Sequence, residues 1–485
     1  MDAERILAAK SAVLYFVGIK GTGMAALAEL LCASGFEVSG SDRDEVFYTD
    51  AILRELDIPC HEHFDPSHIP EKTDLVVYSA AYSPETNAEL AESRRRGLPM
   101  LSYPEALGAY SALFDSSGIA GVHGKTTTTA MAGVLLRAAG IPAKALAGGA
   151  AFGGRSTLSL GGKYFVAETC EYRKHFLSFH PRRIVLTSVE SDHQDYYPEY
   201  GDIRDAFVEY TEKLPGRGIL VYCADDRGAC EVAKIAGRRK DIRIIPYGFT
   251  AEGPWRVESC AVRNERTVFR LTCVPREFRL RVPGRHCVLD AAAALALTGL
   301  LAEEEFHESA ETFWRGEPGK RAAAELENFS GSKRRSEILG EAGGILFMDD
   351  YGHHPTAIKT TLEGLKEFYP GRRLVVSFMS HTYSRTAALL DDFAASLAPA
   401  DLVFLHKIYA SARENNSGGV DGRTLFEAAK NIRGNVFYAD EPEDAAGELE
   451  TILKPGDLFI TMGAGDNWKL GKILFSFFAE GRWPA

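Results

Sequence analysis

The chain has 485 residues, of which 45% are hydrophobic and 25% charged, the balance of an ordinary globular protein. At roughly 150 residues per domain, this length predicts about three domains. The formal net charge of -12 argues against a nucleic-acid partner, because phosphate contacts need a basic face. No basic segment followed by an apolar stretch marks the N-terminus, and no run approaches about 18 uninterrupted apolar residues. We therefore expect no signal peptide, no membrane partner and a cytoplasmic location.

The first part of the chain alternates predicted strands and helices. Residues 12–17 form an apolar run, and residues 22–34 place apolar side chains on one helical face. Residues 37–41 and 75–78 are predicted as further strands. This βαβ pattern indicates a parallel sheet, and we assign residues 1–112 to an N-terminal domain.

Two further units follow. The second, assigned to residues 113–327, contains a glycine-rich segment, predicted antiparallel strands within residues 256–281 and a predicted buried helix over residues 290–301. The third, assigned to residues 328–485, begins after a polar stretch and is predicted to be a small doubly wound α/β domain. Its predicted strands are residues 344–348, 374–378, 402–405, 435–438 and 457–462.

The strongest local signal is the turn Gly121-Val122-His123-Gly124-Lys125-Thr126 before a predicted helix. Backbone N–H groups of such a turn can approach phosphate oxygens, and the helix N-terminus favours the same anion. Lys125 would reach the β- and γ-phosphates of ATP, and the Thr126 hydroxyl would bind Mg²⁺. Ile119 stands where a P-loop glycine is usual, so the turn is of a shorter type, and the alternative is a coincidental turn before a helix. The predicted ATP-binding residues here are Gly121, His123, Gly124, Lys125, Thr126 and Thr127.

Two potential metal ligands lie at predicted strand ends of the same unit. Glu168 ends one strand, and His193 follows the next within Asp192-His193-Gln194-Asp195. Ligands of parallel α/β sheets gather beyond the carboxyl ends of strands, so both side chains are expected beside the phosphate loop. There they could hold Mg²⁺ together with Thr126. Taken alone, Asp-His-x-Asp could equally be a capped turn.

Over nearly its whole length the sequence resembles the Mur ligase family. Residues 121–126 match the family's GTxGKT-type loop, Glu168 its strand-end glutamate and residues 192–195 its DHxD segment. Residues 349–355, Asp-Asp-Tyr-Gly-His-His-Pro, and 381–386, His-Thr-Tyr-Ser-Arg-Thr, are similar to segments of the family branch that adds L-alanine. Further matches are Gly-Arg-His at residues 284–286 and Gly-Ala-Gly-Asp at 463–466.

The resemblance implies an α/β protein with the three-domain Mur ligase architecture. A Rossmann-like N-terminal domain would bind the UDP-sugar, a P-loop ATPase-like central domain ATP, and a doubly wound α/β C-terminal domain the amino acid. It implies an ATP- and Mg²⁺-dependent ligase that joins L-alanine to UDP-N-acetylmuramate through an acyl phosphate, in peptidoglycan precursor synthesis. The further ATP contacts that we expect are His286, Asp290, Arg321 and Asp350.

The implied chemistry assigns roles to a few side chains. Lys125 would offset charge on the phosphoryl oxygens, and Arg385 would pair with the alanine carboxylate as a bidentate fork. His353, His354 or a nearby carboxylate could take the proton of the alanine ammonium, and the sequence does not choose among them. The candidate catalytic residues are Lys125, His353 and Arg385. The expected contacts to the amino-acid end of the substrate are Tyr351, His381 and Arg385.

A second glycine-rich loop, residues 18–24, follows the first predicted strand. The resembling ligases hold the UDP moiety with GIGGIGM here, and Lys20 stands at the middle glycine. Lysine could add a cation for a pyrophosphate or block close backbone approach. Asp42 ends the second predicted strand, where it could bind a ribose or base or merely cap a turn. The predicted UDP-sugar contacts are Gly18, Lys20, Gly21, Gly23 and Asp42.

Two alternatives remain open. A recycling ligase would add an intact murein peptide to the same sugar nucleotide. A divergent, non-catalytic sugar-nucleotide-binding protein is suggested by departures from the family pattern such as Cys170, Cys287 and Asp290. Cys287 cannot replace the two good hydrogen bonds of an amide, so the adenine contact is the most affected.

Overall fold

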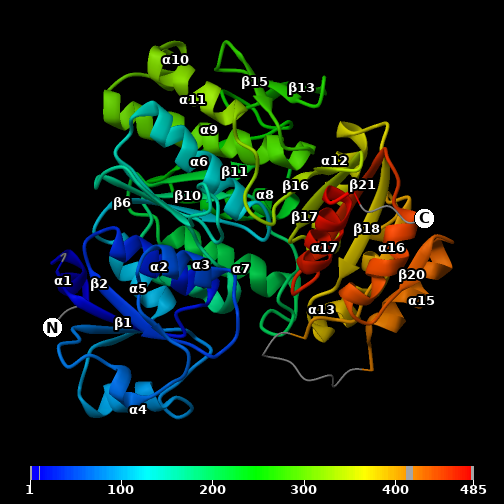
Figure 1. Cartoon of the computed structure of the whole chain (residues 1–485). Coiled ribbons are helices and arrows are strands. Elements are labelled where there is room, and N and C mark those ends of the chain that lie inside the picture. The colour runs from blue at the N-terminus through cyan, green and yellow to red at the C-terminus, as the bar shows by residue number, and fades with distance from the viewer. Residues whose placement is uncertain (1–2, 10, 411–418, 482–485) are drawn as a thin grey trace.

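The structure is a computed structural model that describes residues 3–9, 11–410 and 419–481. The described residues form three α/β units, each on its own central sheet, and one small three-stranded sheet. Figure 1 shows the N-terminal unit in blue below the central unit, and the C-terminal unit in yellow to red beside it. The α/β class predicted from the alternation of strands and helices is thus confirmed.

The N-terminal sheet is fully parallel, in the order β3-β2-β1-β4-β5. The three predicted strands are confirmed, whereas β3 and β5 are too short to give a readable pattern. The strands are β1 Val13–Val17, β2 Glu37–Ser41, β3 Cys60–His61, β4 Leu75–Tyr78 and β5 Met100–Ser102. The helices are α1 Ala3–Ala8, α2 Thr22–Cys32, α3 Thr49–Glu55, η1 Pro66–His68, α4 Ala88–Arg95 and α5 Tyr103–Ser111.

The central sheet has the order β12-β11-β10-β6-β9-β7-β8, and only its edge strand β8 is antiparallel. Since β6 lies between β9 and β10, the segments after these three strands meet at one edge of the sheet. The strands are β6 Asp115–Ala120, β7 Ala143–Leu146, β8 Thr157–Ser159, β9 Tyr164–Glu168, β10 Arg183–Leu186, β11 Ile219–Cys223 and β12 Arg243–Tyr247. The helices are α6 Lys125–Ala139, η2 Tyr172–Ser178, α7 Tyr200–Glu212, α8 Arg227–Ala236, α9 Arg285–Phe306, α10 Ala310–Arg315 and α11 Glu317–Glu327.

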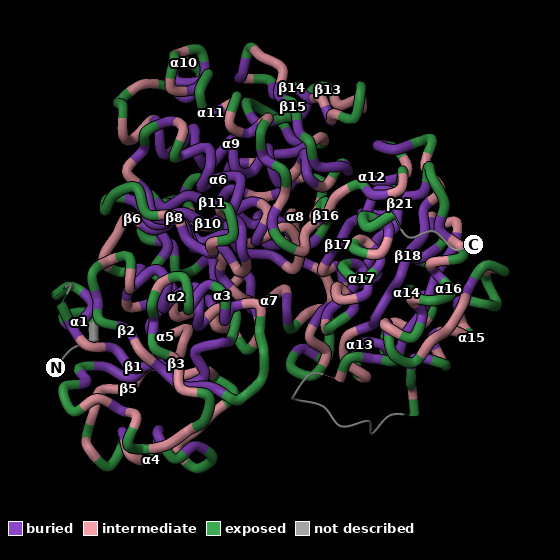
Figure 2. Tube along the Cα trace, viewed as in Figure 1, coloured by how far each residue is buried: buried purple, intermediate pink, exposed green. Residues whose placement is uncertain are grey.

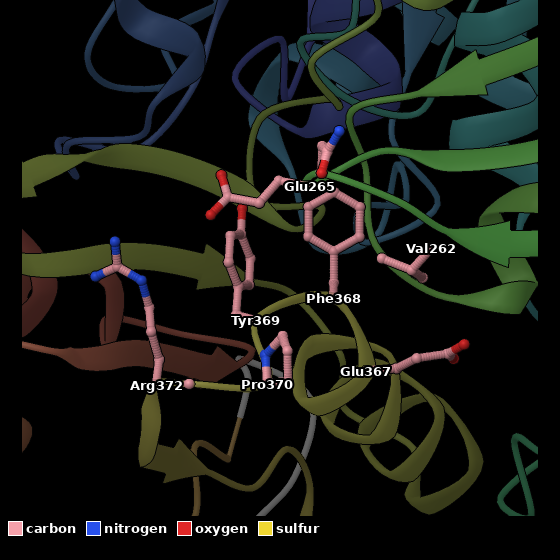
Figure 3. Close-up of a pocket in the computed structure, with 9 residues that line it drawn as sticks. Val262, Glu265, Glu367, Phe368, Tyr369, Pro370 and Arg372 are labelled. Carbon is pink, nitrogen blue, oxygen red and sulfur yellow. The ribbon is translucent and has the colours of Figure 1, made fainter.

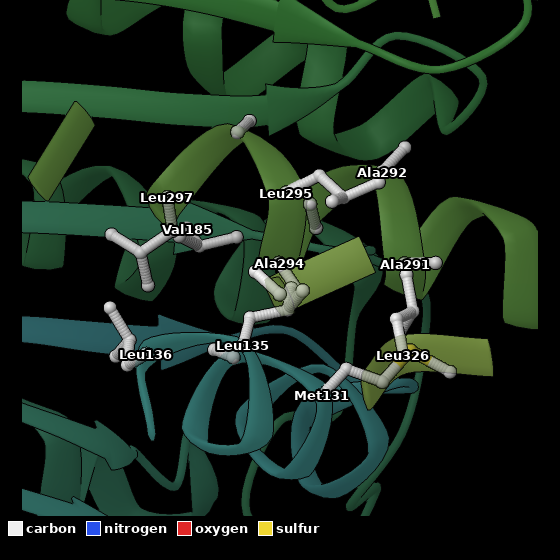
Figure 4. Packing of buried hydrophobic residues seen from close by; sticks show 14 of the residues in the cluster. Met131, Leu135, Leu136, Val185, Ala291, Ala292, Ala294, Leu295, Leu297 and Leu326 are labelled. Atoms are coloured by element: carbon white, nitrogen blue, oxygen red, sulfur yellow. The ribbon is translucent and has the colours of Figure 1, made fainter. Parts of the chain in front are cut away.

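The predicted antiparallel strands of the central unit are confirmed as a separate sheet of β13 Val257–Val262, β14 Thr267–Leu271 and β15 Glu277–Leu280. The core of this unit is the contact between α6 and α9. Figure 4 shows Met131 and Leu135 of α6 facing Ala291, Ala294 and Leu295 of α9. Small alanines bring the helices close, and each fully buried leucine contributes about 1.5–3 kcal/mol.

Among the described residues, α9 is the one helix with the length and apolar composition of a membrane span. Its most apolar window is 83% buried inside the protein. Figure 2 shows the same helix within the buried interior of the central unit. The apolar character of α9 is therefore accounted for by packing in the core.

The C-terminal sheet has the order β16-β17-β21-β18-β19-β20, and only its edge strand β16 is antiparallel. Separate hydrophobic clusters cover its two faces, as a doubly wound sheet requires. The half-exposed β16 was not predicted, whereas the five predicted strands are confirmed. The strands are β16 Glu337–Ala342, β17 Ile345–Asp350, β18 Arg373–Met379, β19 Leu402–Leu405, β20 Val436–Tyr438 and β21 Asp457–Gly463. The helices are α12 Pro355–Phe368, α13 Tyr383–Ala388, α14 Leu390–Ser396, α15 Gly422–Ile432, η3 Pro442–Ala445, α16 Ala446–Ile452 and α17 Trp468–Ala479.

The central and C-terminal units touch backbone to backbone beside α9. A Cβ at Gly364 of α12 would lie 2.7 Å from the Cα of Gly284, which precedes α9. Only a residue without a side chain allows this approach, so the contact fixes α12 next to the start of α9.

Candidate active site

The glycine-rich turn of residues 121–124 joins β6 to α6 at the carboxyl end of the central sheet. Gly121 has φ +141° and Gly124 has φ +78°, and a Cβ at Gly121 would collide with the hydroxyl of Thr187. Both positions therefore require glycine. Within the described part of the chain no side chain caps the first turn of α6, whose N–H groups remain available to an anion.

The ammonium of Lys125 lies back over this turn. Nζ donates to the carbonyl oxygens of Gly121 at 2.5 Å and Val122 at 3.3 Å, and it pairs with Glu171 Oε2 at 2.9 Å. Burial alone would lower the Lys125 pKa, but Glu171 and other acidic neighbours outweigh burial and raise it. Lys125 therefore stays charged. Glu171 was missed from the sequence, although its place three residues after Glu168 is a usable signal.

The three candidate metal ligands lie in two adjoining groups. The Thr126 hydroxyl donates to Glu168 Oε2 at 2.8 Å, and the N–H of Gly148 donates to the same oxygen at 2.7 Å. His193 Nε2 is 3.4 Å from Glu171 Oε1. Hydroxyl and carboxylate oxygens are the donors that Mg²⁺ prefers, and Glu171 adds a second carboxylate. This donor set fits a divalent cation beside the phosphate loop.

In the N-terminal loop, the structure does not support the prediction that Lys20 supplies a cation to a pyrophosphate. The residue is 3% exposed, and Nζ donates to the carbonyl oxygens of Arg43 at 3.2 Å and Glu45 at 3.0 Å. It also pairs with Asp50 at 3.2 Å. The ammonium is thus directed into the loop after β2, because its desolvated charge is satisfied there, and it does not face a pyrophosphate. Asp42 Oδ2 accepts from the Lys20 N–H at 2.7 Å.

Two glycines of the same loop are packed by tyrosine rings. A Cβ at Gly18 would lie 2.8 Å from the ring of Tyr82, and one at Gly23 would lie 2.8 Å from the ring of Tyr103. Burial raises the pKa of Tyr103, and the nearby carboxylate of Glu168 raises it further. Tyr103 therefore packs on the N-terminal loop and lies within electrostatic range of Glu168.

The buried Arg385 joins the C-terminal unit to the DHxD segment. Its Nε and Nη2 donate to Asp192 Oδ1 at 3.0 Å and 2.8 Å, and its Nη1 is 3.2 Å from His381 Nδ1. Burial alone would raise the Asp192 pKa, but Arg385 holds it well below its ordinary value. The structure thus joins Arg385 and His381 of the C-terminal unit to Asp192, the residue before His193, and the guanidinium is paired inside the protein.

His353 is half-buried between Tyr351 and His381. Its ring centroid is 5.0 Å from that of Tyr351 and 5.8 Å from that of His381, and Nδ1 is 3.0 Å from the Tyr351 carbonyl oxygen. Burial, followed by the charge of Arg385, lowers the His353 pKa well below its ordinary value. An Nδ1–H that donates to the carbonyl leaves a neutral ring with a basic Nε2. The lowered pKa leaves this nitrogen unprotonated and able to accept a proton, with less basicity than an ordinary histidine has.

The first turn of α9 lies against the phosphate loop. Asp290 Oδ1 accepts from the Thr128 hydroxyl at 3.2 Å and occupies the space that a Cβ at Gly124 would take. Burial raises the Asp290 pKa to about 8. His286 is half-buried, and desolvation of its ring lowers its pKa. Thr127, in the first turn of α6, is half-buried.

Two further predicted ATP contacts, Asp350 and Arg321, have different surroundings. Asp350 accepts from the N–H groups of Ser336 and Gly352, each at 2.6 Å, so its carboxylate is used to hold the local backbone. Arg321 donates to the carbonyl oxygen of Ala138, at the far end of α6 and about 20 Å along its axis from the phosphate loop. The structure does not bring Arg321 into this site, because α11 packs on the opposite end of α6.

A hollow of about 400 Å³ lies apart from this site, at the end of α12 and beside the hairpin β13–β14. Figure 3 shows Phe368 and Tyr369 on one side and Val262 and Glu265 on the other. None of the predicted site residues lines it. The residues of the candidate site are instead gathered where the three units meet.

Comparison with known families and proteins accounts for this arrangement. Residues 13–115 match the Mur ligase family catalytic domain, residues 119–298 the Mur ligase middle domain and residues 334–465 the Mur ligase glutamate ligase domain. The chain belongs to the Mur ligase family, which supports ATP use and confirms the predicted three-domain architecture.

Curated relatives and solved structures agree with this assignment. The chain is 52% identical over 96% of its length to the UDP-N-acetylmuramate–L-alanine ligase of Treponema pallidum, of which it covers 97%. It is 38% identical to the ligase of the same name from Borreliella burgdorferi, over 95% of this chain and 98% of that one.

Two solved structures have the same fold. The UDP-N-acetylmuramate–alanine ligase of Thermotoga maritima superimposes with a TM-score of 0.76 at 23% identity, covering 96% of this chain and 99% of that one. A murein peptide ligase from Psychrobacter arcticus gives a TM-score of 0.66 at 24% identity with the same coverage. At these identities the likeness extends to the fold alone.

Proposed function

We propose that this chain joins L-alanine to UDP-N-acetylmuramate in an ATP-dependent reaction of cytoplasmic peptidoglycan precursor synthesis. The observation that carries the proposal is the 52% identity to an alanine ligase over 96% of the chain. Two contacts beside the phosphate loop support it. Lys125 pairs with Glu171, and the Thr126 hydroxyl donates to Glu168. They place a cation and potential metal ligands where a triphosphate would bind. The domain limits that we propose are residues 1–112, 113–327 and 328–485.

The reaction balances in two steps. An oxygen of the muramoyl carboxylate attacks the γ-phosphorus of ATP, and the bond from that phosphorus to the β-γ bridging oxygen breaks. ADP departs, and the product of this step is an acyl phosphate. The nitrogen of alanine then attacks the acyl carbon, phosphate departs with the C–O electron pair, and one amine proton passes to a base. Lys125 would offset the charge that develops on the phosphoryl oxygens, and the N–H groups in the first turn of α6, residues 125–127, would position them.

Thr126, Glu168 and His193 are the residues that we propose for Mg²⁺, with Glu171 as a further carboxylate. Bound there, the ion would neutralise phosphate charge beside Lys125. The structure supports this with the hydrogen bond from Thr126 to Glu168 and the approach of His193 to Glu171. We propose that four further residues complete the nucleotide pocket: His123 and Gly124 of the phosphate loop itself, and His286 and Asp290 of α9.

His353 is the proposed base for the alanine ammonium. Its lowered pKa keeps the ring neutral at physiological pH, and Nδ1 is engaged by a carbonyl, so that Nε2 can accept the proton. Tyr351 and His381 flank it, and Arg385 is proposed to share its guanidinium between Asp192 and the alanine carboxylate.

For the sugar nucleotide we propose the N-terminal loop and its glycines Gly18, Gly21 and Gly23, with Asp42 at the end of β2. Lys20 would act indirectly, by holding the loop after β2 in place. The muramoyl end would then reach the phosphate loop past Tyr103, which packs on Gly23 and lies within electrostatic range of Glu168.

Phosphate release from ATP tests this function directly. We expect release that requires UDP-N-acetylmuramate and L-alanine together, with an amide product of the expected mass. The same assay with the murein tripeptide in place of L-alanine tests the recycling alternative. Release with the tripeptide and none with L-alanine would overturn the alanine assignment, and no release with any amine would favour a non-catalytic binding protein.

A further inference from the structure

The carboxylate of Glu190 lies between the phosphate loop and the C-terminal unit. One oxygen, Oε1, is in close contact with His123 Nε2 of the loop. The other, Oε2, accepts from the hydroxyl of Thr356 at 2.9 Å. His354 Nδ1, on the same side, is 3.7 Å from Oε1. Glu190 thus touches two units at once, and none of the roles proposed above uses it.

His123 cannot move without the loop that carries it. Its N–H donates to Ser188 Oγ at 2.9 Å, and its carbonyl accepts from the Thr187 hydroxyl at 2.5 Å. The N–H of Val122 donates to the Ser188 carbonyl at 3.0 Å. These hydrogen bonds connect the turn that would bind phosphate to the segment that ends in Glu190. A shift of the Glu190 carboxylate is therefore transmitted to the loop.

The opposite oxygen of Glu190 meets the N-terminal end of α12. Thr356 is in the first turn of this 14-residue helix, where the helix dipole favours a negative charge. Burial alone would raise the Glu190 pKa, but the hydrogen bond and charge of His123 outweigh it and lower that pKa. The carboxylate is therefore ionised, and it attracts both the loop and the helix.

His123, Glu190 and His354 also have the donor atoms of a transition-metal site, since one atom from each lies within 4.8 Å of the others. Two features disfavour an ion. His354 Nδ1 accepts from the Thr356 N–H at 3.4 Å as the cap of α12, which engages its lone pair. The positive end of α12 also opposes a cation at this point.

We propose that Glu190 is a positioning residue that couples docking of the C-terminal unit on the central unit to the shape of the phosphate loop, so that ATP binds more tightly when α12 is docked. The coupling rests on the proposed function only in taking ATP as the ligand of that loop. Because such coupling is reciprocal, bound ATP also stabilises the docked position of α12.

The test is a double-mutant cycle read out by the Kd of a non-hydrolysable ATP analogue. Thr356→Val removes one hydroxyl in the C-terminal unit, on a helix that supplies no residue to the phosphate loop. We expect it to raise that Kd about three- to tenfold, with the melting temperature unchanged. Thr356→Ser, which keeps the hydroxyl, should restore the wild-type value. Thr360→Val is the matched control, because the Thr360 hydroxyl bonds to the Thr356 carbonyl and not to Glu190.

In a Glu190→Ala background, which removes both carboxylate oxygens, the Thr356→Val change should have no further effect on the Kd. An unchanged Kd in Thr356→Val, or effects of the two changes that simply multiply, would overturn the coupling. A zinc-induced rise in melting temperature in chelator-treated wild type, lost in Glu190→Gln, would overturn it in favour of a metal site. Failure of the wild-type chain to bind the analogue would remove the proposed function itself, and the coupling with it.

Discussion

The molecule contains two glycine-rich turns of the same design, and they use a lysine in opposite ways. Each follows a parallel strand and opens a helix, from β1 to α2 and from β6 to α6. Lys125 turns its ammonium back over the carbonyl oxygens of its own loop. Lys20 sends its ammonium away, onto two carbonyl oxygens of the loop after β2 and the carboxylate of Asp50 in α3.

The difference shows that a lysine near a glycine turn is not by itself evidence of a phosphate ligand. What decides is where the nearest unsatisfied negative groups lie, because a desolvated ammonium must be paired. At Lys125 the pairing groups are at the mouth of the turn, where an anion would replace or join them. At Lys20 they are behind it, so the charge serves the backbone of a neighbouring loop.

Of the changes that test this difference between the two lysines, Lys125→Ala should have the largest effect. Loss of the ammonium removes the charge that offsets the phosphoryl oxygens, and we expect phosphate release to fall by about a thousandfold, equivalent to about 4 kcal/mol of the barrier. Initial-rate measurements with saturating substrates give the value. Binding of UDP-N-acetylmuramate should be nearly unchanged, and a variant that kept a tenth of the activity would exclude Lys125 from the chemistry.

Lys20→Met should act on folding instead. It leaves the buried carboxylate of Asp50 without its cation, and breaking such a pair costs about 3 kcal/mol of unfolding free energy. Urea unfolding followed by circular dichroism measures this loss. The protein that remains folded should keep its kcat, with a raised KM for the sugar nucleotide. A fall in kcat without loss of stability would place the Lys20 ammonium at the substrate after all.

The same contrast shows how far the sequence could predict the site. The strand, turn and helix around Lys125 and the glutamate at the end of β9 were predictable, because each depends on local periodicity and on the rule that parallel strands end at one edge. The pairing of Lys125 with Glu171 joins residues 46 apart, and that of Thr356 with Glu190 joins residues 166 apart. Such pairs depend on packing that no local pattern encodes.

Tertiary packing also sets the surroundings of two predicted ATP contacts. Asp350 belongs to a recognisable segment, but its oxygens are taken by backbone N–H groups of its own unit. Arg321 lies on a helix whose place along α6 is set by the packing of the central core. At Arg321 the residue type suited a nucleotide contact, but the tertiary structure places the side chain at the far end of α6.

The smallest effect that we predict concerns the carboxyl groups behind the two turns. Asp50 has the ammonium of Lys20 as its partner, whereas Asp290 beside Gly124 has a hydroxyl from Thr128, and burial raises its pKa to about 8. A folded-state pKa above the unfolded value means that the native state holds a proton which the unfolded state has released.

The stability that this proton contributes is therefore complete below the unfolded pKa and is lost as the pH rises towards 8. Between pH 6 and pH 8 we expect the wild type to lose on the order of 2 kcal/mol from this group, and Asp290→Asn, which cannot titrate, to lack that slope. Urea unfolding of both proteins across this range measures the difference, and parallel pH profiles would show that the Asp290 carboxyl is ionised in the native protein despite its burial.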